Sequence, residues 1–111
     1  MPIATKREGN TAVISVSGRL DAATSPPYQT AVAELIRSGT TRVVIDVSEL
    51  EYISSAGVLE LLGTASLLQE NVGQLCVANA HGNVASVFKM CGIEKVIKIC
   101  DSVADALAAL A

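Results

Sequence analysis

Apolar and polar residues alternate near the start of the chain in a pattern that predicts an opening β-hairpin. Residues 12–17 read Ala-Val-Ile-Ser-Val-Ser and end at Gly18, which is typical of a strand with one better-buried face. A first strand over residues 3–7 can pair with this segment through the turn formed by Gly9 and Asn10. The chain is therefore expected to begin with two antiparallel strands.

Helical and strand-like patterns then alternate to the end of the sequence. Apolar positions recur at helical spacing in four segments, which predicts helices over about residues 24–37, 55–71 and 83–91 and from 101 or 102 onward. Short apolar runs between them predict strands over residues 42–47, 74–78 and 96–99. The first of these runs is apolar on both faces, which suits the middle of a sheet. This order predicts a single-domain α/β fold over residues 1–111, with a mixed sheet of four or five strands packed with about four helices.

Capping signals mark several of the predicted helix ends. Residues 24–26 read Thr-Ser-Pro, which supplies a hydroxyl to cap free N–H groups and a proline at an early helical position. Gly39 and Gly92 are the expected stops of the first and third helices. Ser102, with Asp105 three residues later, has capping-box spacing at the start of the last helix.

The composition limits the classes of function. The net charge is −3, three residues are aromatic, and Lys and Arg form no block, so we expect no direct contact with nucleic acid. No apolar run approaches the roughly 18 residues of a membrane span. Residues 1–10 are polar where a signal peptide would be apolar. The expectations are therefore no membrane insertion and a cytoplasmic location.

The cysteines and the single histidine do not form a recognisable metal or redox motif. Cys76, Cys91 and Cys100 match neither CxxC spacing nor that of a zinc pair, and we expect them to be buried, reduced thiols. Cys91 in particular is expected on the inner face of its helix. His81 has no neighbours in the sequence that suggest a triad or metal set, so a structural or surface role is expected. No glycine-rich phosphate loop is present, and the sequence predicts no metal site and no bound cofactor.

The most informative segment is the loop expected over residues 46–57, between the central strand and the second long helix. It ends with Ser54 and Ser55 at the predicted helix start. Their hydroxyls would lie beside unpaired backbone N–H groups and the positive end of the helix dipole. An anion placed there would be stabilised.

The same segment also has a purely structural interpretation. One serine would be the N-cap, and the small residues Ala56 and Gly57 would permit close packing. Asp46 and Ser48 would only shape the turn through hydrogen bonds from side chain to backbone. Local physical chemistry leaves both interpretations open.

The whole string resembles the signature of the STAS family. Residues 46–57 read Asp-Val-Ser-Glu-Leu-Glu-Tyr-Ile-Ser-Ser-Ala-Gly and are followed by an apolar helical pattern. Residues 18–22 read Gly-Arg-Leu-Asp-Ala, which looks like the family's segment between its second strand and first helix. The family comprises the anti-sigma factor antagonists and related sulfate-transporter domains, and its order of elements agrees with that predicted here over nearly the full chain.

The resemblance implies specific roles for residues of this segment. In free-standing members, a serine at the start of the second helix is phosphorylated, and this position falls on Ser55, with Ser54 as the alternative. Many members have an acidic residue in place of Ser54 and Ser or Thr in place of Ala56, which bears on the choice between the two serines. Asp21 matches an aspartate near the phosphorylated serine. The implied partner-binding residues are Asp21, Asp46, Ser48, Ser54, Ser55, Ala56 and Gly57.

The resemblance further implies a partner-switching regulator rather than an enzyme. The unphosphorylated protein is expected to bind an anti-sigma factor that is itself a serine kinase of the histidine-kinase-like ATPase type. Phosphorylation by that kinase would end the complex, and a serine phosphatase would restore it. A phosphorylation-independent scaffold in a transport or sensory complex remains the alternative. A serine hydrolase is disfavoured, because the chain has no Gly-x-Ser-x-Gly elbow and His81 has no evident reason to face Ser55.

Overall fold

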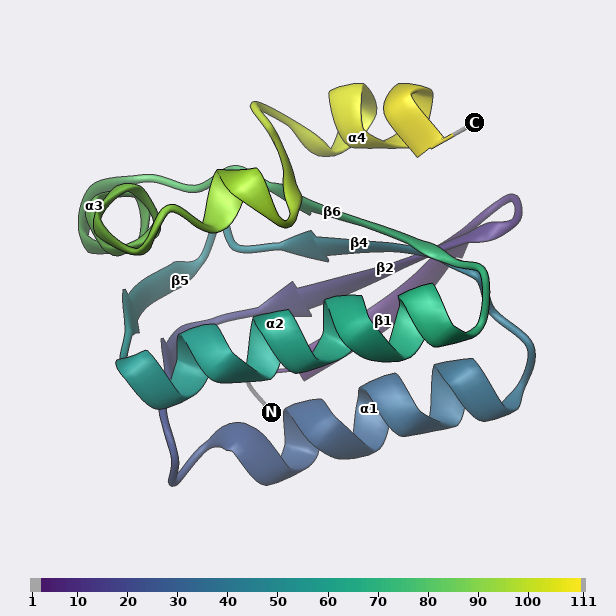
Figure 1. The fold of residues 1–111 in the computed structure, drawn as a ribbon, viewed down its shortest axis with the longest axis horizontal. Coiled ribbons are helices and arrows are strands. Elements are labelled where there is room, and N and C mark those ends of the chain that lie inside the picture. The colour runs from purple at the N-terminus through teal and green to yellow at the C-terminus, as the bar shows by residue number, and fades with distance from the viewer. Residues whose placement is uncertain (1–2, 111) are drawn as a thin grey trace.

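The central element of the structure is a five-stranded mixed sheet (Figure 1). The computed structural model describes residues 3–110. β1 (Ile3–Glu8) and β2 (Thr11–Val16) form the predicted antiparallel hairpin. The strands that follow run parallel in the order β2-β4-β6-β7, and they are β4 (Arg42–Asp46), β6 (Gln74–Ala78) and β7 (Lys98–Cys100). The predicted α/β class and the central position of β4 are confirmed.

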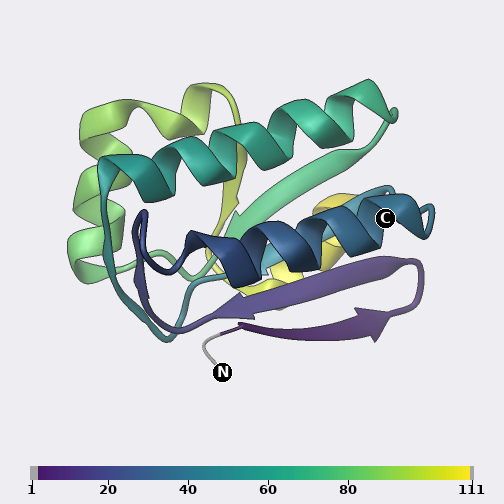
Figure 2. The ribbon, with the colours of Figure 1, turned by 90° about the horizontal axis from the view of Figure 1, so that it is seen from below.

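Helices cover both faces of this sheet (Figures 1 and 2). α1 (Ser25–Arg37) and α2 (Ser55–Glu70) lie side by side on one face, and α4 (Val103–Leu110) covers the other. α3 (Gly82–Cys91) lies beyond the end of the sheet toward which the parallel strands point (Figure 1). Because both faces are covered, β2 is buried on both, whereas its alternating pattern predicts only one better-buried face.

A second, two-stranded parallel sheet lies at the same end of the molecule as α3. β3 (Gly18–Leu20) pairs with β5 (Leu50–Ile53), and both strands are absent from the sequence-based prediction. The prediction of a loop over residues 46–57 is therefore wrong for residues 50–53. The first and last side chains of β5 are buried and the two between them are exposed, so these four residues carry no recognisable strand alternation.

Three smaller predictions are also corrected by the structure. The last strand is β7 rather than residues 96–99, since the chain first forms the 3-10 helix η1 (Ile93–Lys95) and Val96 still has a helical conformation. Cys91 is exposed at the end of α3, where Gly92 turns the chain in a left-handed conformation. Thr24 does not cap α1 through its side chain, because its backbone is already helical; its hydroxyl donates to the carbonyl of Arg19 at 2.9 Å instead.

One buried hydrogen bond links α1 to α2. The phenol oxygen of Tyr28 lies 2.6 Å from Oγ1 of Thr64. Thr64 donates its own hydroxyl proton to the carbonyl of Glu60 at 2.8 Å, so Tyr28 is the donor to Thr64. Removal from water raises the pKa of the Tyr28 phenol and keeps it protonated. The bond is a direct polar contact between the two helices in the interior of the protein.

We expect Tyr28→Phe to lower the free energy of unfolding by about 1 kcal/mol, because it removes this bond and leaves Thr64 bonded to Glu60. Urea unfolding followed by circular dichroism measures the change. Tyr52→Phe is the matched control, since the Tyr52 side chain is 39% exposed, and it should leave the stability unchanged. Equal stability of wild type and Tyr28→Phe would contradict the assignment.

The first turn of α2 approaches β3 so closely that only glycine fits at position 57. The backbone N–H of Ser54 donates to the carbonyl of Leu20 at 3.0 Å. A Cβ atom on Gly57 would collide with that carbonyl oxygen and would lie 2.7 Å from Cγ1 of Ile53. Gly63, in the same helix, has open space around the corresponding position. Gly57 is therefore required by packing.

Alanine substitutions at these two glycines are expected to act in opposite directions. Gly57→Ala should lower the free energy of unfolding by about 1 to 3 kcal/mol, because backbone must move to admit the methyl group. Gly63→Ala should raise it by up to about 1 kcal/mol, because alanine favours the helix and meets no obstacle. Urea unfolding of both variants tests the pair, and a stability of Gly57→Ala at or above that of wild type would refute the close approach.

Candidate functional site

The structure gives the two adjacent serines at the start of α2 different environments. Ser54 is the N-cap, and its Oγ accepts a hydrogen bond from the backbone N–H of Gly57 at 3.2 Å. Its hydroxyl also lies 3.5 Å from the carbonyl of Leu20, to which its backbone N–H donates. The half-buried Ser54 is therefore part of the helix start itself.

Ser55 is the first residue of α2, and it is exposed. Within residues 3–110 its hydroxyl has no hydrogen-bond partner, and the backbone N–H groups of Ser55 and Ala56 have no acceptor. The first turn of α2 contains no acidic residue. An anion attached to Ser55 would thus lie beside two unpaired donors and the positive end of the helix dipole.

Asp21 lies in the turn between β3 and α1, directly after Leu20. Its Oδ1 accepts hydrogen bonds from the backbone N–H groups of Ala23 and Thr24, both at 3.0 Å. Its Oδ2 accepts from Nε of Arg19 at 3.1 Å. The Arg19 guanidinium, followed by the Thr24 N–H, holds the pKa of the Asp21 carboxyl below its ordinary value, so this group is ionised at neutral pH. Asp21 therefore orders the turn next to the start of α2.

Arg19 and Tyr52 belong to the same surface, although neither is among the predicted site residues. The guanidinium carbon of Arg19 lies 4.8 Å from the centroid of the Tyr52 ring. The two residues are far apart in the sequence and come together because β3 pairs with β5. An arginine over an aromatic ring is held by a cation–π attraction, and arginine and tyrosine are both residue types enriched in protein–protein interfaces. The pair therefore adds a contact surface beside the serines.

Asp46 and Ser48 hold the turn between β4 and β5. Oδ1 of Asp46 accepts from the backbone N–H of Ser48 and from Nδ2 of Asn79, both at 3.0 Å. The carbonyl oxygen of Ser48 lies 2.8 Å from Nε2 of His81, and because a carbonyl can only accept, His81 is the donor. The prediction that the Asp46 side chain shapes the turn is confirmed, whereas Ser48 takes part through its backbone N–H and carbonyl rather than through its side chain. Asn79 and His81 also bond to this turn. Within the described residues, His81 makes no hydrogen bond to Ser55.

The predicted site residues lie at one end of the molecule but at different depths. Ser48 and Ser55 are exposed, and Gly57 is buried. The half-buried members of the set are Asp21, Asp46, Ser54 and Ala56. Gly57 therefore contributes through packing under the surface rather than through its own contact with a partner.

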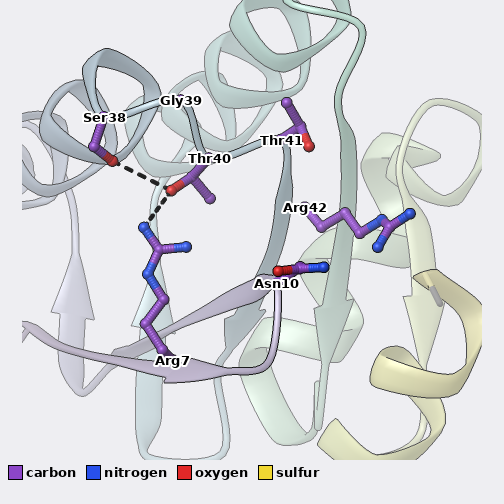
Figure 3. Close-up of a pocket in the computed structure, with 7 residues that line it drawn as sticks. All are labelled: Arg7, Asn10, Ser38, Gly39, Thr40, Thr41 and Arg42. Atoms are coloured by element: carbon purple, nitrogen blue, oxygen red, sulfur yellow. Dashed lines mark hydrogen bonds between the residues drawn. The ribbon is translucent and has the colours of Figure 1, made fainter.

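A polar depression at the opposite end of the sheet is separate from this surface (Figure 3). It is lined by Arg7, Asn10 and residues 38–42. Arg7 donates to Oγ1 of Thr40 at 2.7 Å, whereas the side chain of Arg42 points away from Arg7. Because the two guanidinium groups do not converge, the depression offers no site where both would bind one anion.

Two further features of the described residues concern metal binding and membrane spans. Across residues 3–110, no three side chains of His, Cys, Asp or Glu lie close enough together to hold a metal ion. None of the helices in that range combines the length and apolar character that a membrane span requires.

Comparisons with known proteins relate this arrangement to a family. A family model described as STAS domain matches residues 2–106. The putative anti-sigma factor antagonist BtrV of Bordetella bronchiseptica is 29% identical over 90 residues, which cover 81% of this chain and 78% of BtrV. An anti-sigma factor antagonist from Mycobacterium paratuberculosis has a crystal structure that matches with a TM-score of 0.89 at 25% identity, covering 97% of this chain and 92% of that one.

A third comparison is with the Bacillus cell fate determinant SpoIIAA in its phosphorylated form. That structure matches with a TM-score of 0.76 at 20% identity, covering 98% of this chain and 99% of that one. At this identity the likeness concerns the fold. Together with the family match over almost the whole sequence, these findings show that the chain belongs to the STAS domain family.

Proposed function

We propose that this chain is an anti-sigma factor antagonist that works by partner switching, binding an anti-sigma factor when unphosphorylated and releasing it when Ser55 is phosphorylated. The names of its relatives, and a structural neighbour known in a phosphorylated form, support this function. The observation that carries it is the exposed hydroxyl of Ser55, which is unbonded within residues 3–110. The function is regulation by binding rather than catalysis.

Ser55 is a better phosphate acceptor than Ser54 for a geometric reason. A kinase must bring the γ-phosphate of its nucleotide in line with the serine oxygen, and Ser55 is exposed. The oxygen of Ser54 is already bonded to Gly57 N–H and lies against the carbonyl of Leu20. Phosphorylation of Ser54 would disrupt its capping hydrogen bond with Gly57 and would place negative charge against the carbonyl oxygen of Leu20.

A phosphate on Ser55 is compatible with the fold. It adds about −1.5 to −2 charges at neutral pH. The dipole of α2 favours this charge, the free N–H groups of Ser55 and Ala56 are available within the described structure, and no acid in the first turn repels it. We therefore expect the phosphorylated chain to stay folded, so the charge acts on the partner rather than on the antagonist.

The same charge would oppose a protein partner seated on this end of the molecule. Arg19, Tyr52 and Asp21 would lie in that interface, around the serine. A phosphate buried there must lose water or meet groups that were selected to face a neutral hydroxyl, and such mismatches cost several kcal/mol. A cost of about 3 to 5 kcal/mol weakens binding roughly a hundred- to several thousand-fold, which is enough to release the partner.

The partners proposed for this switch are those that the likeness to anti-sigma factor antagonists implies. One of them must supply the nucleotide whose phosphate is transferred to Ser55. We place that role with an anti-sigma factor that is a serine kinase of the histidine-kinase-like ATPase type, and removal of the phosphate with a serine phosphatase. Because the kinase consumes ATP, the exchange would take place in the cytoplasm.

Mass spectrometry of the protein isolated from its native cells tests the acceptor directly. We expect a phosphate on Ser55 in wild type, its loss in Ser55→Ala and its retention in Ser54→Ala. A phosphate found on Ser54 would keep the mechanism and move the acceptor. Absence of any phosphate under several growth and stress conditions would favour the phosphorylation-independent scaffold.

The two serines should also differ in their contribution to stability. Ser54→Ala removes the cap of α2 and should lower the free energy of unfolding by about 1 kcal/mol. Ser55→Ala removes an exposed hydroxyl and should change it by less than about 0.5 kcal/mol. Urea unfolding followed by circular dichroism gives both values, and a reversed order of effects would be inconsistent with the assigned roles.

A further inference from the structure

Two cysteines from neighbouring strands meet beneath α4. β6 and β7 run parallel with Ala78 opposite Cys100, so Cys76 is a diagonal neighbour of Cys100 on the same face of the sheet. Their Sγ atoms are 2.8 Å apart, and both thiols are free in the structure. A formed disulfide has a sulfur–sulfur distance of about 2.05 Å. The two sulfurs thus lie close to bonding distance.

The environments of the two thiols differ. Cys76 is fully buried between the sheet and α4, among side chains that include Val44 and Ala106. Burial raises the pKa of the Cys76 thiol, and hydrogen bonding to Cys100 raises it further, while the charge of Lys98 acts in the opposite direction. Cys100 is half-buried, so an oxidant from solution reaches Cys100 before Cys76.

We propose that Cys76 and Cys100 form an intramolecular disulfide when the protein meets a peroxide. The sulfur of Cys100, as thiolate, attacks one oxygen of hydrogen peroxide, the O–O bond breaks and, with a proton, one water leaves, which gives a sulfenic acid on Cys100. The sulfur of Cys76 then attacks the Cys100 sulfur, the S–O bond breaks, and the hydroxyl leaves with the Cys76 proton as a second water. Two thiols lose two hydrogens in total, and one peroxide is reduced to two waters.

The position of β7 permits the movement that this bond requires. The two sulfur atoms, now 2.8 Å apart, must approach to about 2.05 Å, so one of the two strands has to shift toward the other residue. β7 is three residues long and lies at the edge of the five-stranded sheet, where β6 is its neighbour. Bond formation therefore draws Cys100 along β6 toward Cys76.

A chain of hydrogen bonds leads from this pair to the turn beside the candidate site. The carbonyl of Cys100 accepts the backbone N–H of Asn79 at 3.3 Å. The side chain of Asn79 donates to Asp46, which in turn holds the backbone N–H of Ser48. Movement of Cys100 therefore alters the support of the Ser48 turn. The proposed disulfide does not depend on phosphorylation of Ser55.

The test uses the full chain carrying Cys91→Ser, so that the exposed third thiol cannot join two molecules. Reduced protein is treated with hydrogen peroxide, unfolded and exposed to N-ethylmaleimide. We expect a mass lower by two hydrogens, no alkylation, and peptides joined through Cys76 and Cys100, all reversed by dithiothreitol. In the matched Cys91→Ser/Cys100→Ser variant, Cys76 should remain open to alkylation after the same treatment.

Two outcomes of this experiment would contradict the proposed disulfide. Alkylation of both cysteines after peroxide, or oxidation of Cys100 to sulfinic acid while Cys76 is still alkylated, would overturn the disulfide. The coupling to the Ser48 turn has its own readout in nitrogen-15 NMR spectra. We expect the Ser48 amide signal to shift on oxidation and to return on reduction, and a disulfide that leaves this signal unmoved would overturn the coupling.

Discussion

The backbone carbonyl of Leu20 is the contact on which the candidate site depends. It accepts the N–H of Ser54 at 3.0 Å, lies 3.5 Å from the Ser54 hydroxyl, and leaves no room for a side chain at Gly57. Leu20 ends β3, and β3 pairs with the strand that leads directly into α2. β3 therefore positions both β5, which leads into α2, and the first turn of α2 itself. Asp21 follows at once and orders the turn beside it.

This contact separates the residue that builds the helix start from the residue that is available to a partner. The Ser54 hydroxyl oxygen accepts the capping hydrogen bond from Gly57, whereas the Ser55 hydroxyl is unbonded within the described residues. A switch benefits from this separation, because a group that changes its charge should not also be one that holds the fold together. The helix dipole adds to the arrangement, since it favours a negative charge on the exposed Ser55, the proposed acceptor.

The two faces of the sheet are covered by different helices, and each helix layer is connected to the candidate site in its own way. On one face, the bond between Tyr28 and Thr64 links α2, whose first residue is Ser55, to α1. On the other, α4 covers Cys76 and Cys100, whose backbone is connected through Asn79 to Asp46. Phosphorylation of Ser55 would therefore act at the surface, at the start of α2. Oxidation of the cysteines would act from the opposite face of the sheet, through Asn79 on the turn that Asp46 holds.

The sequence by itself determined the elements whose signals are local. The long helices, the opening hairpin, the central strand and the serine pair at the start of α2 follow from periodicity, turn residues and a motif confined to twelve positions. Only the tertiary structure decided which serine caps the helix, that Arg19 stacks on Tyr52, that Cys91 faces solvent, and that Cys76 lies against Cys100. Each of these depends on how segments distant in the chain pack or pair. Strands as short as β3 and β5 bury too few side chains to show a period of their own, so their pairing, and the surface it creates, cannot be deduced from local pattern.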